Sequence, residues 1–173
     1  RRGSAPCNTA VATLRSLLRN GPRMAISIRE ETAEDIPTIR SVNEVAFGRP
    51  AEARVIDRLR RTCDGLLSLV AVDGEEVVGH ILFSPVTVKD GSTTTQGMGL
   101  APMAVSPDYQ RKGIGTELVK CGLKTLRNRG CPFVIVLGHA GYYPRFGFEP
   151  ASRYGLCSQW KGIPDEVFMI VVF

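Results

Sequence analysis

The sequence predicts an α/β (α+β) domain built on a mixed, mostly antiparallel central sheet, and two observations carry this prediction. Residues 100–105 form an apolar run, residues 114–129 follow a helical pattern, and residues 133–137 form a second apolar run. A strand, a helix and a strand in this order make a βαβ unit, whose two strands should be parallel. The dipeptide Asp73-Gly74 separates two β-like runs and therefore indicates an antiparallel hairpin.

Length and composition are those of one globular domain. The chain has 173 residues, of which 43% are hydrophobic and 23% charged, so it can bury a substantial core. No apolar run approaches the roughly 20 residues of a membrane-spanning helix, so we expect a cytoplasmic protein without a membrane partner. The five cysteines include no C-x-x-C pair and there are only two histidines, which favours reduced thiols over disulfides or a metal site.

The charge balance of the chain suits an anionic ligand. The formal net charge is +5 and the sequence pI is about 9.1. A polyanionic small molecule and a nucleic acid would both fit this balance. Because the basic residues are scattered and no recognised nucleic-acid motif occurs, we expect no nucleic-acid partner. A nucleic-acid-binding domain is kept as a third hypothesis, which predicts affinity that falls steeply with salt.

Residues 1–23 are interpreted as an extension that precedes the domain. The segment is basic, contains no acidic residue and is followed by Met24, where a regular domain begins. It could have been added by cloning, translated from upstream of the natural start, or be a genuine flexible extension. Its composition also resembles that of a transit peptide. We expect residues 24–173 to form a single domain without it.

A short strand and two helices are expected in the first part of this domain. Residues 26–28 alternate like a strand. Thr32, with Asp35 three residues later, is typical of a helix start, and apolar residues then recur at helical spacing. Gly48-Arg49-Pro50 ends this helix, and a second helix is expected over residues 51–61.

Three strands should follow as an antiparallel meander. They are expected over residues 66–72, 77–88 and 96–105, with a break in the second strand at Ser84-Pro85. Pro102 cannot donate a hydrogen bond to a ladder, so it belongs at a sheet edge or at a bulge. After the βαβ unit, residues 152–164 are loop-like and residues 166–173 form an apolar terminal strand.

The stretch Gln110-Arg111-Lys112-Gly113-Ile114-Gly115-Thr116 has the composition of an anion-binding turn. It lies between a strand and a helix, and the first N–H groups of a helix have no intrahelical partner and carry the positive end of its dipole. The two glycines lack a Cβ, so a phosphate could approach the backbone closely. The stretch is neither a Walker A loop nor a dinucleotide fingerprint, because the glycines that those motifs require are missing.

This turn resembles the acetyl-coenzyme A signature of the GCN5-related N-acetyltransferases (GNAT), written Q/R-x-x-G-x-G/A. Gln110, Gly113 and Gly115 fill its fixed positions. The resemblance implies that the seven residues of the turn hold the pyrophosphate of acetyl-CoA. It also implies a bulged strand that parts from its neighbour, so that the pantetheine arm pairs with the backbone of Met103, Ala104 and Val105.

A second stretch, residues 138–148, resembles the YhbS-like branch of the same family. Phe146-Gly147-Phe148 aligns with a family pattern that places a tyrosine at Tyr143. The resemblance implies that Tyr143 protonates the departing thiolate, with Tyr142 as its nearest rival. The chain lacks the asparagine that many members carry before the tyrosine, and His139 lies in that region instead. In order of elements the resemblance extends over residues 26–173, but its motifs are confined to residues 100–116 and 138–148.

The resemblance implies a GNAT-like fold, with helices on both faces of the sheet, and an acetyl-CoA-dependent N-acetyltransferase. The acceptor would be the amine of a small molecule or a peptide, and residues 152–164 could line its pocket or pack on the sheet. His139 is a candidate base, water could serve instead, and His80 is expected in the core. A non-catalytic acyl-CoA-binding or regulatory module of the same fold is the main alternative, and a homodimer remains an open arrangement.

Overall fold

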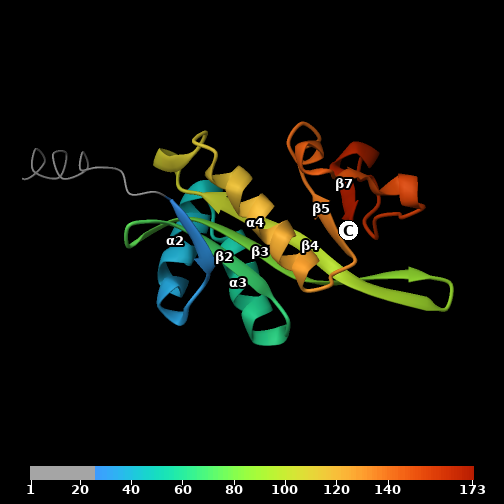
Figure 1. The fold of residues 1–173 in the computed structure, drawn as a ribbon, viewed down its shortest axis with the longest axis horizontal. Coiled ribbons are helices and arrows are strands. Elements are labelled where there is room, and N and C mark those ends of the chain that lie inside the picture. The colour runs from blue at the N-terminus through green and yellow to red at the C-terminus, as the bar shows by residue number, and fades with distance from the viewer. Residues whose placement is uncertain (1–25) are drawn as a thin grey trace, which may run out of the picture.

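The computed structural model describes residues 26–173, which form a seven-stranded sheet in the order β1-β2-β3-β4-β5-β7-β6 (Figure 1). Every neighbouring pair is antiparallel except β4 and β5, which are parallel. The predicted mixed, mostly antiparallel sheet is therefore confirmed. Met24 and the preceding extension lie outside the described residues. The strands are β1 (Ser27–Glu30), β2 (Leu67–Asp73), β3 (Glu76–Asp90), β4 (Thr93–Val105), β5 (Phe133–Leu137), β6 (Glu149–Pro150) and β7 (Phe168–Val172).

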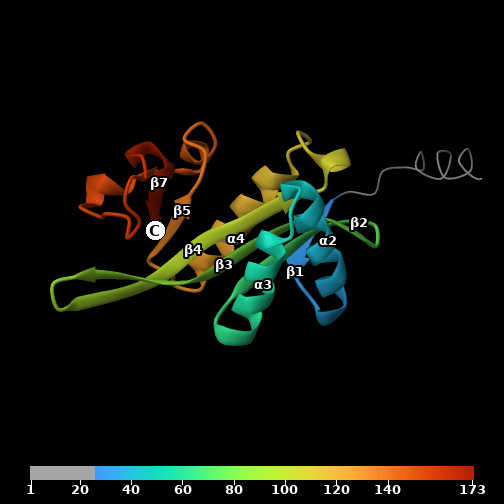
Figure 2. The ribbon, with the colours of Figure 1, turned by 180° about the vertical axis from the view of Figure 1, so that it is seen from behind.

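In the described residues, three α-helices cover the two faces of the sheet. Helices α2 (Ile36–Phe47) and α3 (Ala51–Thr62) lie on one face, and α4 (Ile114–Asn128) lies on the other, as Figures 1 and 2 show from opposite sides. Short 3₁₀ turns are η1 (Ala33–Asp35), η2 (Pro107–Tyr109), η3 (Tyr143–Phe146), η4 (Ala151–Tyr154) and η5 (Asp165–Val167). The expected helix boundaries agree with these bounds to within a few residues.

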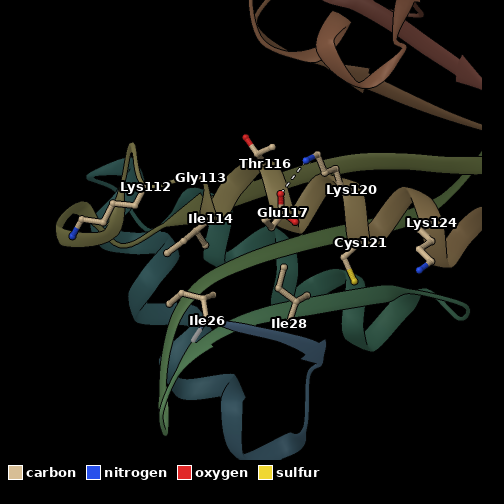
Figure 3. Close-up of a pocket in the computed structure, with 10 residues that line it drawn as sticks. All are labelled: Ile26, Ile28, Lys112, Gly113, Ile114, Thr116, Glu117, Lys120, Cys121 and Lys124. Carbon is tan, nitrogen blue, oxygen red and sulfur yellow. Dashed lines mark hydrogen bonds and ion pairs between the residues drawn. The ribbon is translucent and has the colours of Figure 1, made fainter. Parts of the chain in front are cut away.

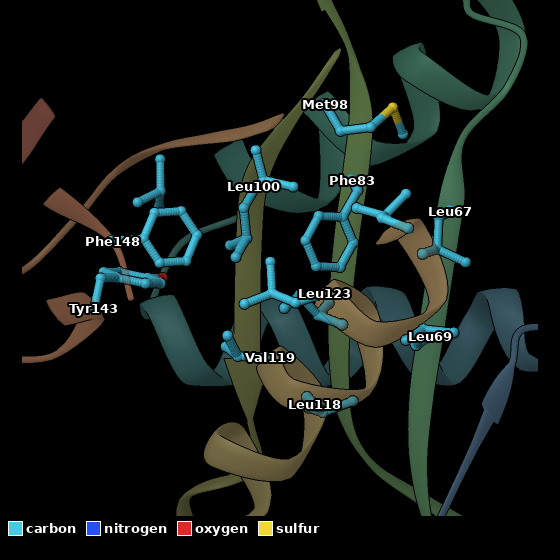
Figure 4. Close-up of a cluster of buried hydrophobic side chains, with 14 of the residues drawn as sticks. Leu67, Leu69, Phe83, Met98, Leu100, Leu118, Val119, Leu123, Tyr143 and Phe148 are labelled. Carbon is cyan, nitrogen blue, oxygen red and sulfur yellow. The ribbon is translucent and has the colours of Figure 1, made fainter. Parts of the chain in front are cut away.

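The main core lies between α4 and the sheet. The apolar positions of α4 recur at helical spacing and turn one side of the helix toward the strands, where Leu118, Val119 and Leu123 are buried. They meet Phe83 and Leu100 from β3 and β4 (Figure 4). Burial of this apolar stripe fixes α4 against the sheet, and it thereby fixes where the N-terminus of the helix lies.

One expectation about β3 was wrong. The predicted break at Ser84-Pro85 does not form, because β3 runs without interruption past Pro85, which pairs with Met98 of β4. Strand β2 pairs with β3 only as far as Phe83, so Pro85 lies where that edge of β3 has no strand partner. A proline is tolerated at such an edge because no ladder hydrogen bond is lost there. Beyond this point, β3 and β4 continue as a two-stranded arm that extends past the body of the domain (Figure 1).

A β-bulge lies in β4 at Pro102, which is one of the two positions, a sheet edge or a bulge, that the sequence allowed for this proline, and the one that the resemblance implied. Ile81 of β3 pairs with Met103, but Phe83 pairs with Leu100, so two residues of β4 oppose one residue of β3. The extra residue changes the course of β4. Strand β5 pairs with β4 only at residues 98–100, and the two strands part immediately before the bulge.

His80 belongs to a buried polar network beneath α2 and α3, as expected for a core residue. Its side chain is fully buried; Ser68 Oγ lies 2.9 Å from Nε2 and Asn43 Nδ2 lies 3.2 Å from Nδ1. Ser68 also donates to Glu31, which pairs with Arg60 at 2.6 Å. Burial lowers the pKa of His80 to about 4, so the imidazole is neutral at pH 7.

Candidate functional site

The turn between β4 and α4 presents backbone N–H groups without a side-chain cap. Arg111 and Gly113 both adopt positive φ, of 58° and 86°, and α4 begins at the next residue, Ile114. Within residues 26–173, no side-chain hydrogen bond caps the N-terminus of the helix. Gln110 Nε2 donates to Val105 O at 3.0 Å, which ties the turn back to the end of β4. The turn is therefore fixed at the strand end and can accept an anion at the helix N-terminus.

The two cations of the turn are arranged differently. The Lys112 ammonium donates to the carbonyl of Asp108 and lies 5.1 Å from the ring centroid of Tyr109, so it folds back over the preceding 3₁₀ turn. Arg111 is exposed and takes part in no ion pair within the described part of the chain. Thr116 is half-buried in the first turn of α4. The structure thus brings the backbone of the predicted turn together but directs the Lys112 side chain elsewhere.

The strand residues predicted to face the pantetheine lie where β4 has left β5. These residues, Met103, Ala104 and Val105, pair with β3 on one side, and no strand of the described part of the chain pairs with their other side. Ser106 N–H donates to Val78 O at 2.8 Å. Along an antiparallel pair of strands, residues whose backbone groups bond to the partner strand alternate with residues whose backbone groups point away from it. This alternation directs the backbone groups of Ala104 toward β3. It directs those of Met103 and Val105 to the unpaired side, where a ligand could bind as an added strand.

Tyr142 and Tyr143 reach this region from the segment after β5. The Tyr142 hydroxyl lies so close to α4 that a Cβ on Gly115 would be 3.1 Å from it and 3.5 Å from Cε of Met103. Tyr143 is 7% exposed and packs edge-on against Phe148, with ring centroids 5.6 Å apart. Figure 4 shows the ring of Tyr143 extending toward β4. The planes of the Tyr142 and Tyr143 rings make an angle of 84°. Tyr142 borders the turn, and Tyr143 borders the core.

The environment of Tyr143 keeps its hydroxyl protonated. Burial of the ring, with a smaller contribution from Tyr142, raises the pKa of Tyr143 to about 12. A group with this pKa remains a proton donor at neutral pH. His139 differs in that its side chain is exposed and makes no hydrogen bond within residues 26–173. Its carbonyl accepts the N–H of Tyr142 at 2.9 Å, so the backbone of His139 shapes the turn that carries both tyrosines.

Gly138 is a site residue that the sequence did not single out. It directly follows β5, and a Cβ at this position would lie 2.1 Å from Cε2 of Tyr143. Only a residue without a side chain lets the tyrosine ring approach the end of β5 this closely. The only sequence signal for this contact is that Gly138 precedes Tyr143 by five residues. That spacing indicates a contact only when the course of the turn between them is known.

A basic cavity of about 660 Å³ lies along the flank of α4 that faces β1 (Figure 3). Gly113 and Thr116 of the turn border it at one end, and three lysines, Lys112, Lys120 and Lys124, lie along it. Figure 3 shows Lys120 turned toward Glu117, with which it is paired at 3.0 Å. Because β5 is on the other side of β4 from β1, this cavity is separate from the parting of β4 and β5.

The loop over residues 152–164 both packs on the sheet and borders a second cavity. Leu156 contacts the cluster formed by Phe133, Ala151 and Ile170. Residues 155–160 line a cavity of about 630 Å³ together with β3, β5 and β7. The two expectations for this loop are thus not exclusive. Within residues 26–173, no group of side chains could hold a metal ion, the four cysteines are free, and no helix is long and apolar enough to span a membrane.

Comparisons with known proteins agree with this geometry. A family model described as an acetyltransferase (GNAT) domain matches residues 27–151. The uncharacterized N-acetyltransferase YjhQ of Escherichia coli (strain K12) is 42% identical over 132 residues, which cover 75% of this chain and 70% of YjhQ. The uncharacterized N-acetyltransferase YhbS of the same strain is 38% identical over 136 residues, which cover 78% of this chain and 80% of YhbS.

Two solved structures resemble the fold over most of its length. YhbS from Escherichia coli, in complex with CoA, superposes with a TM-score of 0.78 and 36% identity, covering 87% of this chain and 83% of that one. A GNAT acetyltransferase from Brucella melitensis, in complex with acetyl-CoA, gives a TM-score of 0.70 and 35% identity, covering 86% and 88%. The bulged, parted strand, the uncapped turn and these relatives lead to one conclusion: the chain belongs to the GNAT family of acetyltransferases, in its YhbS-like branch.

Proposed function

We propose that the protein transfers the acetyl group of acetyl-CoA to a primary amine. The observation that carries this proposal is the parting of β4 from β5 directly beside the uncapped N-terminus of α4. An elongated anionic thioester needs an anion site at one end and unpaired backbone groups for its arm, and these two features adjoin one another here. The relatives crystallised with CoA and with acetyl-CoA support the choice of cofactor.

In this proposal the cofactor lies along the turn and the strand. The pyrophosphate binds the backbone N–H groups of Gly113, Ile114 and Gly115 at the positive end of α4. The exposed Arg111 supplies positive charge beside the phosphates. The Lys112 ammonium can also turn toward them if it gives up its hydrogen bond to the exposed carbonyl of Asp108. The pantetheine arm pairs with Met103 and Val105 in the manner of an added strand. This places the thioester near Leu100, where β4 and β5 part.

The chemistry follows from these positions. An uncharged amine attacks the thioester carbonyl, the new C–N bond forms, and the C–S bond breaks to release the thiolate of CoA. A backbone N–H on the unpaired side of β4 can polarise the carbonyl. Tyr143 then gives its hydroxyl proton to the thiolate and regains a proton from solvent; its hydroxyl is protonated at neutral pH and can therefore act as the donor. The amine loses a proton in this step. Water can accept it, and His139 is the candidate if a side chain serves as the base.

Thermal unfolding with and without acetyl-CoA tests the cofactor site, with ATP and NAD as controls. Ligand near one hundred times its Kd adds about 2.7 kcal/mol to the free energy of unfolding. For a chain of this size that raises Tm by roughly 5–11 °C. Gly115→Glu should abolish the shift, because its carboxylate would lie beside the phosphates, whereas Thr94→Glu on the exposed arm should retain it. No shift in the unmodified protein at millimolar acetyl-CoA would remove the proposal.

Amine acetylation is the second requirement. Release of CoA thiol should depend on both acetyl-CoA and an amine, and the acetylated amine should appear in equal amount. A protein that binds acetyl-CoA with the expected Tm shift, but acetylates none of a broad set of amines, would instead be a non-catalytic acyl-CoA-binding module.

A further inference from the structure

The second cavity lies on the face of the sheet that is opposite α4. Val134 and Val136 of β5 pack into the core beneath α4, so strand alternation directs Ile135 to the other face. Ile135 lines the cavity there, together with Phe168 of β7 and with Val86 and Val88 of the β3–β4 arm. The loop over residues 155–160 closes the remaining side. Its volume of about 630 Å³ is in the range of small-molecule sites.

The lining of this cavity combines apolar and uncharged polar side chains, and it contains no acidic residue. Its apolar side chains come from four segments: Val86, Val88, Ile135, Leu156, Trp160 and Phe168. Thr87, Cys157, Ser158 and Gln159 add neutral polar groups, and Lys89 is the charged residue that borders the cavity. Because Val86 and Val88 face the cavity, alternation along β3 directs the Lys89 side chain to the opposite face. Among the described residues that line the cavity, none carries a carboxylate that could pair with a cationic group.

One residue that lines the cavity, Ile135, lies next to the point where β4 and β5 part. Ile135 pairs with Gly99, and the next pair, Leu100 with Val136, is the last between the two strands. Gly99 faces the cavity side, since a Cβ on it would lie 2.8 Å from Cγ1 of Val86. A group in the cavity is therefore one residue along the strands from the place that the proposed function gives to the thioester.

We propose that this cavity is the acceptor pocket, and that the acceptor is a monoamine with an uncharged apolar body, aromatic or branched aliphatic. This inference rests on the proposed acetyl transfer. A second ammonium placed against Leu156, Trp160 and Phe168 would lose part of its hydration without gaining a carboxylate partner from the lining, which is unfavourable. An apolar body is instead stabilised by burial, and its one amine can enter in the neutral form that attacks the thioester. Diamines and aminoglycoside-like polycations are the classes that this pocket disfavours.

The single tryptophan of the chain makes occupancy of the cavity measurable. Trp160 is the only tryptophan in the sequence, and it lies at the cavity with 57% of its surface exposed. The protein saturated with CoA is titrated with 2-phenylethylamine, with isopentylamine and with 1,4-diaminobutane, and tryptophan emission is excited at a wavelength that only indole absorbs. The two apolar amines should change the emission saturably, and 1,4-diaminobutane should leave it unchanged over the same range.

Variants of the loop test the same inference through activity. Trp160→Ala should lower kcat/KM for 2-phenylethylamine roughly tenfold, because an aromatic wall is lost. Gln159→Glu introduces a carboxylate and should shift the ratio of kcat/KM values toward 1,4-diaminobutane, also roughly tenfold. Tyr154→Ala is the matched control, since Tyr154 is an exposed aromatic residue of the same region that does not line the cavity. This variant should leave unchanged both kcat/KM for 2-phenylethylamine and the ratio of the kcat/KM values for the two amines.

The outcomes separate this inference from the function on which it rests. Absence of a thermal shift with acetyl-CoA would remove the proposed function itself. A normal shift combined with better acetylation of 1,4-diaminobutane than of 2-phenylethylamine would overturn only the assignment of the acceptor. Equal responses of Trp160→Ala and Tyr154→Ala would also overturn it, because the cavity would then have no part in acceptor binding.

Discussion

The ring of Tyr143 lies against the backbone of Gly138, so closely that a Cβ on the glycine would be 2.1 Å from the ring. Gly138 is the first residue after β5, and its N–H donates to Val167 O at 2.9 Å, which holds the end of the strand in place. The tyrosine is thereby held between Phe148 and the strand end. The position of the proposed acid thus depends on a residue that has no side chain.

Gly138→Ala should displace Tyr143 and lower both stability and turnover. The added methyl group overlaps a ring that is itself packed in the core, and such overpacking typically costs about 1–3 kcal/mol. Gly141→Ala is the control in the same segment, because nothing lies within 4 Å of a Cβ there. Chemical denaturation and steady-state kinetics measure the two effects. If both alanine variants had the same stability, the close approach of ring and backbone would not matter in solution.

Tyr143→Phe should lower kcat by about 10²–10⁴-fold while acetyl-CoA still raises Tm. The substitution removes only the hydroxyl from a ring that stays packed against Phe148. Tyr142→Phe is the comparison, because its hydroxyl lies beside Gly115 at the turn. We expect this second variant to weaken cofactor binding more than it lowers kcat. The reverse pattern would transfer the role of acid to Tyr142.

Arg111→Ala should weaken acetyl-CoA binding more than Lys112→Ala does. Arg111 is exposed beside the helix N-terminus, whereas the Lys112 ammonium is held by the Asp108 carbonyl and the Tyr109 ring. To reach a phosphate, Lys112 must first leave these contacts. Titration calorimetry at two salt concentrations measures the difference. A larger loss for Lys112→Ala would mean that the lysine is rearranged in the bound state.

His80 predicts a pH dependence of stability. Its pKa falls from 6.5 to about 4 on folding, so between these values the unfolded state binds the proton more readily. The stabilisation is complete above pH 6.5 and is lost as the pH falls toward 4, by roughly 3 kcal/mol in all. Glu31 and Arg60 are the charged groups that act on the ring.

Denaturation midpoints between pH 7 and 4, compared with those of His80→Gln, measure this contribution. The variant should lose the dependence that belongs to His80, although it will be less stable at pH 7 because the contacts to Ser68 and Asn43 are altered. The chain has only two histidines, so NMR can follow the His80 ring directly. Titration of His80 near 6.5 in the folded protein would contradict the prediction.

Local rules were enough to predict most of the fold. The Asp73-Gly74 turn, the helical period of α4 and the apolar run of β5 each depend on neighbours in sequence, and each was confirmed. Pro102 could be restricted to a sheet edge or a bulge because a proline has few positions in a sheet, and the structure has the bulge. Pro85 misled the prediction because the tolerance of a strand for proline depends on whether its edge is paired, which sequence alone does not reveal.

The contacts of the candidate site depend on residues that are distant in sequence. The turn at Gly113 could be expected from its own residues, but the fold of Lys112 onto Tyr109 depends on how the preceding segment is placed. The approach of Tyr142 to Gly115 likewise joins two segments that only the packing of α4 brings together. The catalytic and cofactor roles of these residues stay predictions.

The short ladder between β4 and β5 has a mechanical consequence. Three residue pairs, at Met98, Gly99 and Leu100, join the part of the sheet formed by β1–β4 to the part formed by β5, β7 and β6. Beyond this short ladder, the two parts are joined by the apolar core, in which Val134 and Val136 of β5 pack with Phe83 and Leu118. A cofactor bound between β4 and β5 would add contacts to both parts of the sheet. Occupancy of the site would then stiffen the whole molecule, including parts that the cofactor does not touch.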